Sequence, residues 1–176
     1  SNHYGYAQTS TGPGHSTVAT GTHPGVHGII GNSWFDKKSK KSIYCVDDFN
    51  YKTVGSKTNQ GEKSPSNLLT TTLSDENRVA TNFKGKTIGV AIKDRGSILS
   101  SGHTANAAYW FDSKEGSFIT STYYLTDLPF WAEEFNKSRH IDSYLKPWDT
   151  YYDISTYVES SLDNNNYESN FSGEEN

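Results

Sequence analysis

Methionine is absent from this sequence, and cysteine occurs once, at Cys45. A single cysteine excludes an internal disulfide, and it leaves the compartment open because many proteins outside the cytoplasm also lack disulfides. There is no run of about 18 apolar residues, and no charged segment followed by an apolar one opens the chain, so neither a membrane span nor a signal peptide is predicted. Because the first residues read as the middle of a fold, we interpret the chain as part of a longer protein.

Positive charge is also scarce, since 16 basic residues accompany 20 acidic ones and the net charge is −4. No broad basic surface can then neutralise phosphates, which excludes nucleic acid as a partner. Mean hydropathy is low at −0.76, yet aromatic residues make up 14% of the chain, which favours a folded domain with long polar loops. The length predicts one domain spanning 1–176, in which residues 159–176 are expected to be loosely ordered.

The N-terminal part of the chain predicts short elements separated by loops. Residues 14–20 favour a short helix, which Gly21 ends and Pro24 keeps from resuming. Residues 26–36 are typical of a loop that leads into a short strand. The basic stretch 37–41 is typical of a solvated turn between two strands.

A surface loop and a longer helix are expected next. Residues 47–63 are polar and contain two glycines, which indicates a loop. Ser64, followed by Pro65, predicts the N-cap of a helix that Gly85 ends. The apolar residues on one face of this helix predict contact with the core, and they are Leu69, Leu73, Ala80 and Phe83.

The second half of the chain is expected to supply the sheet. Residues 87–92 are apolar on both faces, as in a central strand covered by helices, and a short helix is expected at 96–99. Residues 107–111 and 117–124 predict a β-hairpin. Asp127 is expected to cap a last helix, with a core-facing stripe of Leu128, Trp131 and Phe135. Helices and strands in this order predict an α/β fold.

A candidate anion site lies where the first helix begins, in Thr11-Gly12-Pro13-Gly14-His15. The N-terminus of a helix presents unpaired N–H groups and a partial positive charge, and glycines let a phosphate approach the main chain closely. Gly and Pro also make ordinary turns, so the local pattern alone leaves both interpretations open.

Two basic residues, Lys93 and Arg95, follow the strand predicted at 87–92. If the extended geometry persists, residues two apart leave the same face, so both side chains are expected together at the carboxyl end of the strand. Ligands of open α/β sheets bind at that edge, and a Lys charge beside a forked guanidinium suits a tetrahedral oxyanion. Taken alone, these residues also fit an ordinary exposed turn.

Together, Thr11-Gly12-Pro13-Gly14-His15, Gly31-Asn32-Ser33-Trp34 and Lys93-Asp94-Arg95 resemble the alkaline phosphatase superfamily, specifically its threonine-nucleophile, phosphate-irrepressible (PafA-like) alkaline phosphatases. Residues 24–29 and 102–110 agree as well, so the resemblance covers nearly the whole chain. It implies an alkaline-phosphatase-like central sheet flanked by helices, of which this chain holds the N-terminal part of the catalytic domain. It also implies a periplasmic or secreted location.

In such enzymes the threonine attacks phosphorus, and zinc-bound hydroxide then hydrolyses the phospho-threonine. The resemblance assigns the nucleophile to Thr11, which alone among three successive hydroxyl residues directly precedes Gly-Pro-Gly. A threonine hydroxyl is a poor nucleophile near neutral pH, so it needs a bound cation. The residues that the resemblance places on the non-bridging phosphoryl oxygens, where charge must be balanced in the transition state, are Asn32, Lys93 and Arg95.

Two zinc ions are the cofactors that the resemblance implies, and Thr11 is the one zinc ligand that it places in this chain. The family's upstream aspartate and its downstream Asp and His ligands have no counterpart here, so the chain is not expected to bind zinc fully. Histidine is a common zinc ligand. The resembling motifs nevertheless make the four candidate histidines structural, and these are His15, His23, His27 and His103.

Three functions remain open at this point. The first is part of a zinc-dependent phosphate monoesterase that releases inorganic phosphate, with the isolated chain inactive. The second is a phosphodiesterase or nucleotide pyrophosphatase of the same superfamily, although two cations aimed at one phosphoryl group favour the dianionic monoester. The third is a non-catalytic anion-binding α/β module, which rests on the missing metal ligands.

Overall fold

The computed structural model describes residues 5–147 and 149–158, and the chain divides into two units, of which the first ends at Ile141 and the second begins at Asp142. The elements, in order, are α1 (Thr11–Thr20), α2 (Pro24–His27), β1 (Ser33–Asp36), β2 (Lys41–Tyr44), β3 (Thr53–Val54), α3 (Leu73–Ala80), β4 (Ile88–Ala91), α4 (Asp94–Ser101), β5 (Ala107–Asp112), β6 (Ser117–Ser121), α5 (Phe130–Lys137), and the 3₁₀ helices η1 (His140–Tyr144) and η2 (Ile154–Thr156). The described helices are all too short or too polar to cross a bilayer. The expectation for residues 159–176 lies outside the described residues.

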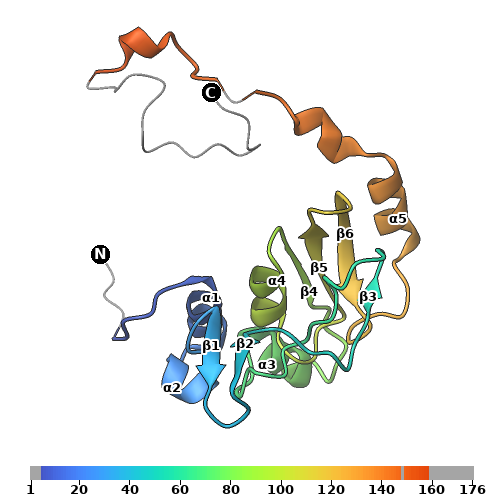
Figure 1. Ribbon diagram of the computed structural model, residues 1–176. Coiled ribbons are helices and arrows are strands. Elements are labelled where there is room, and N and C mark those ends of the chain that lie inside the picture. The colour runs from blue at the N-terminus through green and yellow to red at the C-terminus, as the bar shows by residue number, and fades with distance from the viewer. Residues whose placement is uncertain (1–4, 148, 159–176) are drawn as a thin grey trace. The chain divides into compact units, whose positions relative to one another are not determined.

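A mixed four-stranded sheet forms the centre of the first unit, in the order β3-β6-β5-β4 (Figure 1). β4 and β5 are parallel, and the other neighbours are antiparallel. The hairpin predicted between β5 and β6 is present, and its last pair is Asp112 with Ser117. Gly116 occupies its turn at φ +66°, a conformation that glycine adopts without strain. The predicted α/β class with a central sheet flanked by helices is confirmed.

Helix α4 lies between the sheet and α1 (Figure 1). It approaches β4 closely at Gly89, where a Cβ would overlap the hydroxyl of Ser101 and lie 2.8 Å from the carbonyl oxygen of Ser97. On the other side α4 meets α1, so that a Cβ on Gly96 would lie 3.4 Å from Nε2 of His15. The buried apolar core that joins these layers comprises Ile29, Cys45, Val46, Leu68, Ile98, Leu99, Ala108, Trp110 and Ile119.

The short elements near the N-terminus agree with the sequence. Helix α1 starts three residues earlier than predicted, and it ends at Gly21, which has φ +68° and donates its N–H to the carbonyl of Thr17. The basic stretch turns between β1 and β2 as predicted, and the Asp36 carboxylate accepts the N–H of Ser39 at 2.7 Å. Residues 47–63 are mostly loop, although they contribute the short strand β3.

Strand β4 is not the central strand that its apolar residues predicted. It lies at one end of the strand order and, in the described part of the chain, pairs only with β5. One face is covered by α4, while Ile88 and Val90 on the other face are 57% and 63% exposed. Apolar residues on both faces do not distinguish a covered strand from one with an open face, which explains the error.

The helix predicted from Ser64 begins at Leu73 instead, as α3. Thr72 and Asp75 form a capping box, in which the Thr72 hydroxyl accepts the Asp75 N–H at 3.1 Å and the Asp75 carboxylate accepts the Thr72 N–H at 2.9 Å. These reciprocal bonds define the helix start more strongly than Ser64 followed by proline. The stripe predicted to face the core is exposed, and it comprises Leu69, Leu73, Ala80 and Phe83.

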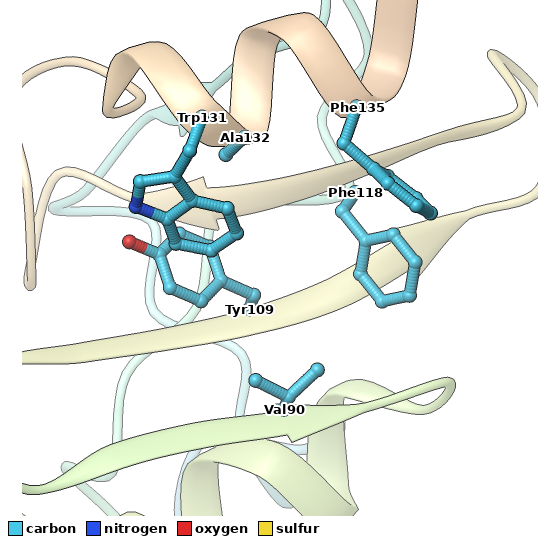
Figure 2. A pocket seen from close by; sticks show the side chains of 6 residues that line it. All are labelled: Val90, Tyr109, Phe118, Trp131, Ala132 and Phe135. Carbon is cyan, nitrogen blue, oxygen red and sulfur yellow. The ribbon is translucent and has the colours of Figure 1, made fainter. Parts of the chain in front are cut away.

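Helix α5 begins at Phe130 and is not capped by Asp127. Within this helix Ala132 is buried, but Trp131 and Phe135 remain 58% and 40% exposed. The predicted core stripe is therefore only partly buried. Figure 2 shows both aromatic side chains over a pocket of about 260 Å³ between α5 and the sheet. Its other lining residues are Val90, Tyr109, Phe118 and Ala132. No charged side chain lines it, which makes it unsuitable for an anion.

Candidate active site

Thr11 is the first residue of α1, at the helix mouth where the sequence predicted it, and Ser10 is the N-cap. The Thr11 side chain is half-buried and lines an open groove of about 490 Å³. The other lining residues are Tyr6, Thr9, Ser10, Gly14, His15, Val18 and Ser100. Since the first N–H groups of a helix lack partners inside it, an accessible hydroxyl and a partial positive charge coincide here.

Asn32 is held against the start of α1. Its Oδ1 accepts the N–H of Gly12 at 2.7 Å, which satisfies one of the N–H groups that a helix leaves unpaired. With the amide oxygen engaged in this way, the Nδ2 group is left to donate to a ligand. The approach leaves little room for a side chain, because a Cβ on Gly12 would lie 3.2 Å from Asn32 Oδ1, 3.2 Å from the carbonyl oxygen of Gly31 and 3.3 Å from Sγ of Cys45.

Lys93 and Arg95 do not share a face of an extended strand, contrary to the sequence-based expectation. Strand β4 ends at Ala91, Lys93 is the N-cap of α4, and Arg95 lies in the first turn of that helix. The Asp94 carboxylate accepts the N–H of Arg95 at 2.6 Å, and its negative charge stabilises the helix start. Both basic residues nevertheless follow the carboxyl end of β4 directly, with Lys93 exposed and Arg95 half-buried.

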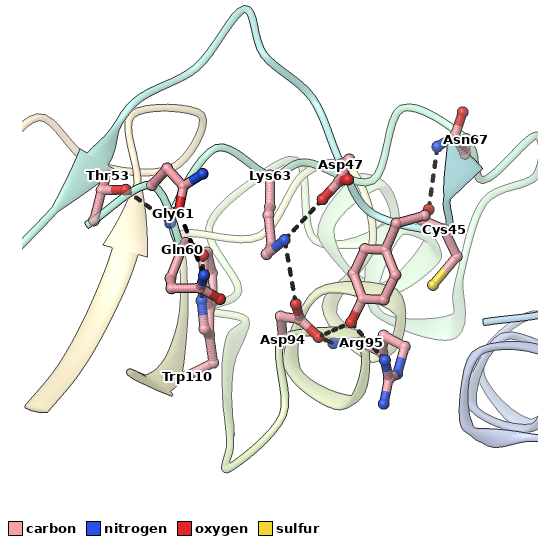
Figure 3. Close-up of polar contacts among 12 residues, drawn as sticks. Cys45, Asp47, Thr53, Gln60, Gly61, Lys63, Asn67, Asp94, Arg95 and Trp110 are labelled. Carbon is pink, nitrogen blue, oxygen red and sulfur yellow. Dashed lines mark hydrogen bonds and ion pairs between the residues drawn. The ribbon is translucent and has the colours of Figure 1, made fainter. Parts of the chain in front are cut away.

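Arg95 belongs to a polar network that the sequence did not reveal. Its Nη1 donates to the hydroxyl of Tyr44 at 2.5 Å, and that hydroxyl donates to Oδ1 of Asp94 at 2.7 Å. Figure 3 shows Lys63 between two carboxylates, with Nζ 2.8 Å from Asp47 and 3.5 Å from Asp94. No short-range signal announces this network, because Tyr44 and Arg95 are 51 residues apart.

The end of β2 contacts both α4, at Arg95, and the start of α1, at Gly12. Tyr44 holds Arg95, and the next residue, Cys45, packs its Sγ against Gly12 at the start of α1. Burial raises the pKa of Cys45 to about 12, so its thiol stays neutral. Helix α1, which begins at Thr11, also packs on α4, the helix that bears Arg95.

Three of the four candidate histidines have polar contacts within the fold, and these are His15, His27 and His103. His27 is buried, its Nε2 lies 3.1 Å from Oγ1 of Thr17, and its Nδ1 accepts the N–H of Ile29 at 3.2 Å. Burial is the main reason why the pKa of His27 is lowered. His15 and His103 each place a ring nitrogen near a backbone carbonyl oxygen, at 2.9 Å and 3.3 Å.

A zinc site needs at least three protein ligands drawn mainly from His, Cys, Asp and Glu. Within residues 5–147 and 149–158 no three such side chains are grouped closely enough to hold a metal ion. The Thr11 hydroxyl would supply a single ligand. The described residues therefore do not fit a complete zinc site by themselves.

The fold places the chain in the alkaline phosphatase superfamily. The crystal structure of wild-type alkaline phosphatase PafA superposes with a TM-score of 0.88 at 45% identity, over 93% of this chain and 32% of that one. A PafA variant changed at a threonine, an asparagine, a lysine and an arginine superposes equally well, with a TM-score of 0.88 at 42% identity and the same coverage of 93% and 32%.

Comparison of sequences gives a family model and several curated relatives. A family model described as type I phosphodiesterase / nucleotide pyrophosphatase matches residues 1–171. Alkaline phosphatase PhoV of Synechococcus elongatus is 52% identical over 169 residues, which are 96% of this chain and 31% of that protein. A calcium-transporting ATPase of Myroides odoratus is 49% identical over 170 residues, with 96% and 31% covered.

The chain belongs to the type I phosphodiesterase / nucleotide pyrophosphatase family, and within the alkaline phosphatase superfamily it is PafA/PhoV-like. It spans about a third of the length of the relatives that it matches, and it corresponds to their N-terminal region.

Proposed function

We propose that the whole protein hydrolyses phosphate monoesters through a covalent intermediate on Thr11. The observation that carries this proposal is the accessible Thr11 hydroxyl at the mouth of α1, beside Asn32 and next to the helix that bears Lys93 and Arg95. The superposed PafA variant is changed at the same four residue types, in the same order along the chain, which supports the choice of these four residues.

In the proposed reaction, Oγ1 of Thr11 loses its proton to solvent and forms a bond to phosphorus as the bond from phosphorus to the leaving oxygen breaks, and the departing alkoxide takes up a proton from solvent to become the alcohol. Water then cleaves the phospho-threonine, which restores the hydroxyl and releases inorganic phosphate. Asn32 Nδ2 donates to a non-bridging oxygen. Lys93 and Arg95 balance the charge on these oxygens, which costs little reorganisation because the donors are already placed.

Zinc belongs to this proposal as the cofactor of the whole protein, where it would activate a hydroxyl that is a weak nucleophile near neutral pH. Its remaining ligands would come from outside the described residues. The isolated chain is therefore expected to show little or no phosphatase activity, with or without added zinc. Robust zinc-stimulated turnover by these 176 residues would contradict this expectation.

The nucleophile can be tested in the full-length protein by comparing Thr11→Ala with Thr126→Ala. Loss of a covalent nucleophile is expected to lower the rate on an aryl phosphate at least about a thousandfold. The matched change at exposed Thr126 is expected to leave the rate within about threefold, because Thr126 does not line the groove that Thr11 lines. Mass spectrometry after acid quenching should find the phosphate on the peptide that contains Thr11. An unchanged rate in Thr11→Ala would exclude the assignment.

A phosphodiester substrate is the second candidate, and the description of the matching family model favours it. Against it, Lys93 and Arg95 offer two positive charges to one phosphoryl group, which suits a dianionic monoester better than a monoanionic diester. Measuring kcat/KM of the full-length protein on an aryl phosphate and on the matching diester decides between them. A preference for the diester would reverse our choice.

A periplasmic or secreted location is a further proposal that rests on the resemblance alone. Fractionation of the source cells, with immunodetection of the full-length protein, tests it. Recovery in the cytoplasmic fraction would exclude it.

A further inference from the structure

The guanidinium of Arg95 makes a hydrogen bond through Nη1 but none through Nε. Nη1 donates to the Tyr44 hydroxyl at 2.5 Å, and the guanidinium carbon lies 5.3 Å from the centre of the Tyr44 ring. In contrast, Nε is buried and has no hydrogen-bond partner among the residues that the structure describes. A buried N–H without a partner carries a desolvation cost, which an anion bound at that edge would remove.

Tyr44 is itself held by the charged side chains of Asp94 and Lys63. Its hydroxyl donates to Asp94, whose carboxylate lies near Lys63 at 3.5 Å. Lys63 Nζ also lies 4.7 Å from the centre of the Tyr44 ring. Burial, followed by the charge of Asp94, raises the pKa of the Tyr44 hydroxyl well above its ordinary value. The hydroxyl therefore stays protonated in alkaline solution, where it donates to Asp94 and accepts from Arg95 at the same time.

We propose that Tyr44 is a positioning residue of the phosphate clamp: by holding Nη1 of Arg95, its hydroxyl fixes the guanidinium so that its remaining N–H groups can bind the phosphoryl group. Arginine binds phosphate most strongly when two parallel N–H groups are presented together, and a fixed guanidinium presents them without loss of side-chain freedom on binding. This inference rests on the proposed function, because it assumes that Arg95 contacts the phosphoryl group.

The experiment is a double-mutant cycle in the full-length protein, with an aryl phosphate as substrate and inorganic phosphate as inhibitor. The variants are Tyr44→Phe, Arg95→Ala and the double variant. Tyr123→Phe is the matched control, because that half-buried tyrosine also donates its hydroxyl, to the carbonyl oxygen of His103 at 2.9 Å, and it does not contact Arg95. Circular dichroism and urea unfolding establish that each variant is folded.

Tyr44→Phe is expected to lower kcat/KM about tenfold and to weaken inhibition by phosphate about as much, which corresponds to one charge-assisted hydrogen bond. In the Arg95→Ala background the same change is expected to alter kcat/KM less than about twofold, because there is no guanidinium left to position. Tyr123→Phe is expected to keep kcat/KM within about twofold.

Two results would overturn the inference. One is an unchanged kcat/KM in Tyr44→Phe, and the other is an equal loss with and without Arg95, which would indicate a general structural effect. If Arg95→Ala alone leaves kcat/KM unchanged, the role of Arg95 in the proposed function fails instead. The two failures are therefore distinguishable.

Discussion

Gly12 and Gly14, two residues apart in α1, are expected to respond to alanine with opposite signs. A Cβ on Gly14 would meet nothing within 4 Å. Alanine there gains helix propensity and restricts the unfolded chain, which is worth about 0.5–1 kcal/mol. We therefore expect Gly14→Ala to raise the free energy of unfolding by that amount.

At Gly12 the same gain is outweighed by overpacking. A Cβ would lie 3.2 Å from Asn32 Oδ1, 3.2 Å from the carbonyl oxygen of Gly31 and 3.3 Å from Cys45 Sγ, so an amide, a main-chain carbonyl and a buried thiol must move together. Inserting a methyl group into such a site costs about 1–3 kcal/mol. After subtracting the propensity gain, Gly12→Ala is expected to destabilise the protein by about 1 kcal/mol.

Gly12→Ala is also expected to lower activity, because it displaces Asn32. Displacing Asn32 weakens the 2.7 Å bond that holds its amide, which we propose donates to the phosphoryl group. Misplacing one such donor is worth about 1.4 kcal/mol, so kcat/KM of the full-length protein should fall about tenfold.

Urea unfolding followed by tryptophan fluorescence compares the two variants with the unsubstituted protein, and aryl phosphate hydrolysis gives the kinetic effect. Gly14→Ala serves as the matched control for stability, since it makes the same chemical change in the same helix. The reasoning is refuted if Gly12→Ala raises the unfolding midpoint as much as Gly14→Ala does.

Three further predictions concern buried packing around α3 and α4. Asp75 is 1% exposed and accepts hydrogen bonds from two threonines. Asp75→Ala should therefore lower the free energy of unfolding, measured with urea, by about 3 kcal/mol. The control Glu76→Ala, at an exposed neighbour, should lower it by less than about 0.5 kcal/mol. Burial opposes ionisation of Asp75, but these hydrogen bonds hold its pKa below the usual value. Its stabilisation should therefore be present above about pH 4 and lost as pH falls through the lowered pKa; a stability gap between Asp75→Ala and the unsubstituted protein that stays constant in acid would contradict this. Gly89→Ala should destabilise by about 2 kcal/mol or more, since its Cβ would overlap Ser101 and separate α4 from β4, and an unchanged urea midpoint would show that α4 adjusts.

Features that depend on adjacent residues could be predicted from the sequence. The left-handed glycine at Gly21 ends α1, and the hairpin closes near Gly116. The start of α1 was predicted less closely, since the helix begins at Thr11 and not at residue 14. Such features were predictable because helix ends and tight turns are determined by the backbone preferences of a few neighbouring residues.

Burial was predicted less well, for a physical reason. Apolar spacing shows which residues share a face, but not whether another element covers that face. Ile88 and Val90 of β4 and Trp131 of α5 were all expected in the core, and all are more than half exposed. The capping box at Thr72 and Asp75 was present in the sequence and could have corrected the start of α3.

The sequence by itself determined the residue types of the candidate site: a hydroxyl before Gly-Pro-Gly, an asparagine, and two basic residues after a strand. Only the tertiary structure decided how they are held. The Gly12 N–H reaches Asn32 across 20 residues and Arg95 reaches Tyr44 across 51, in contacts created when α1 packs on α4 and β2 ends beside both. No local spacing encodes such partners, because they depend on which helices and strands meet, and that is settled by the burial of the whole core.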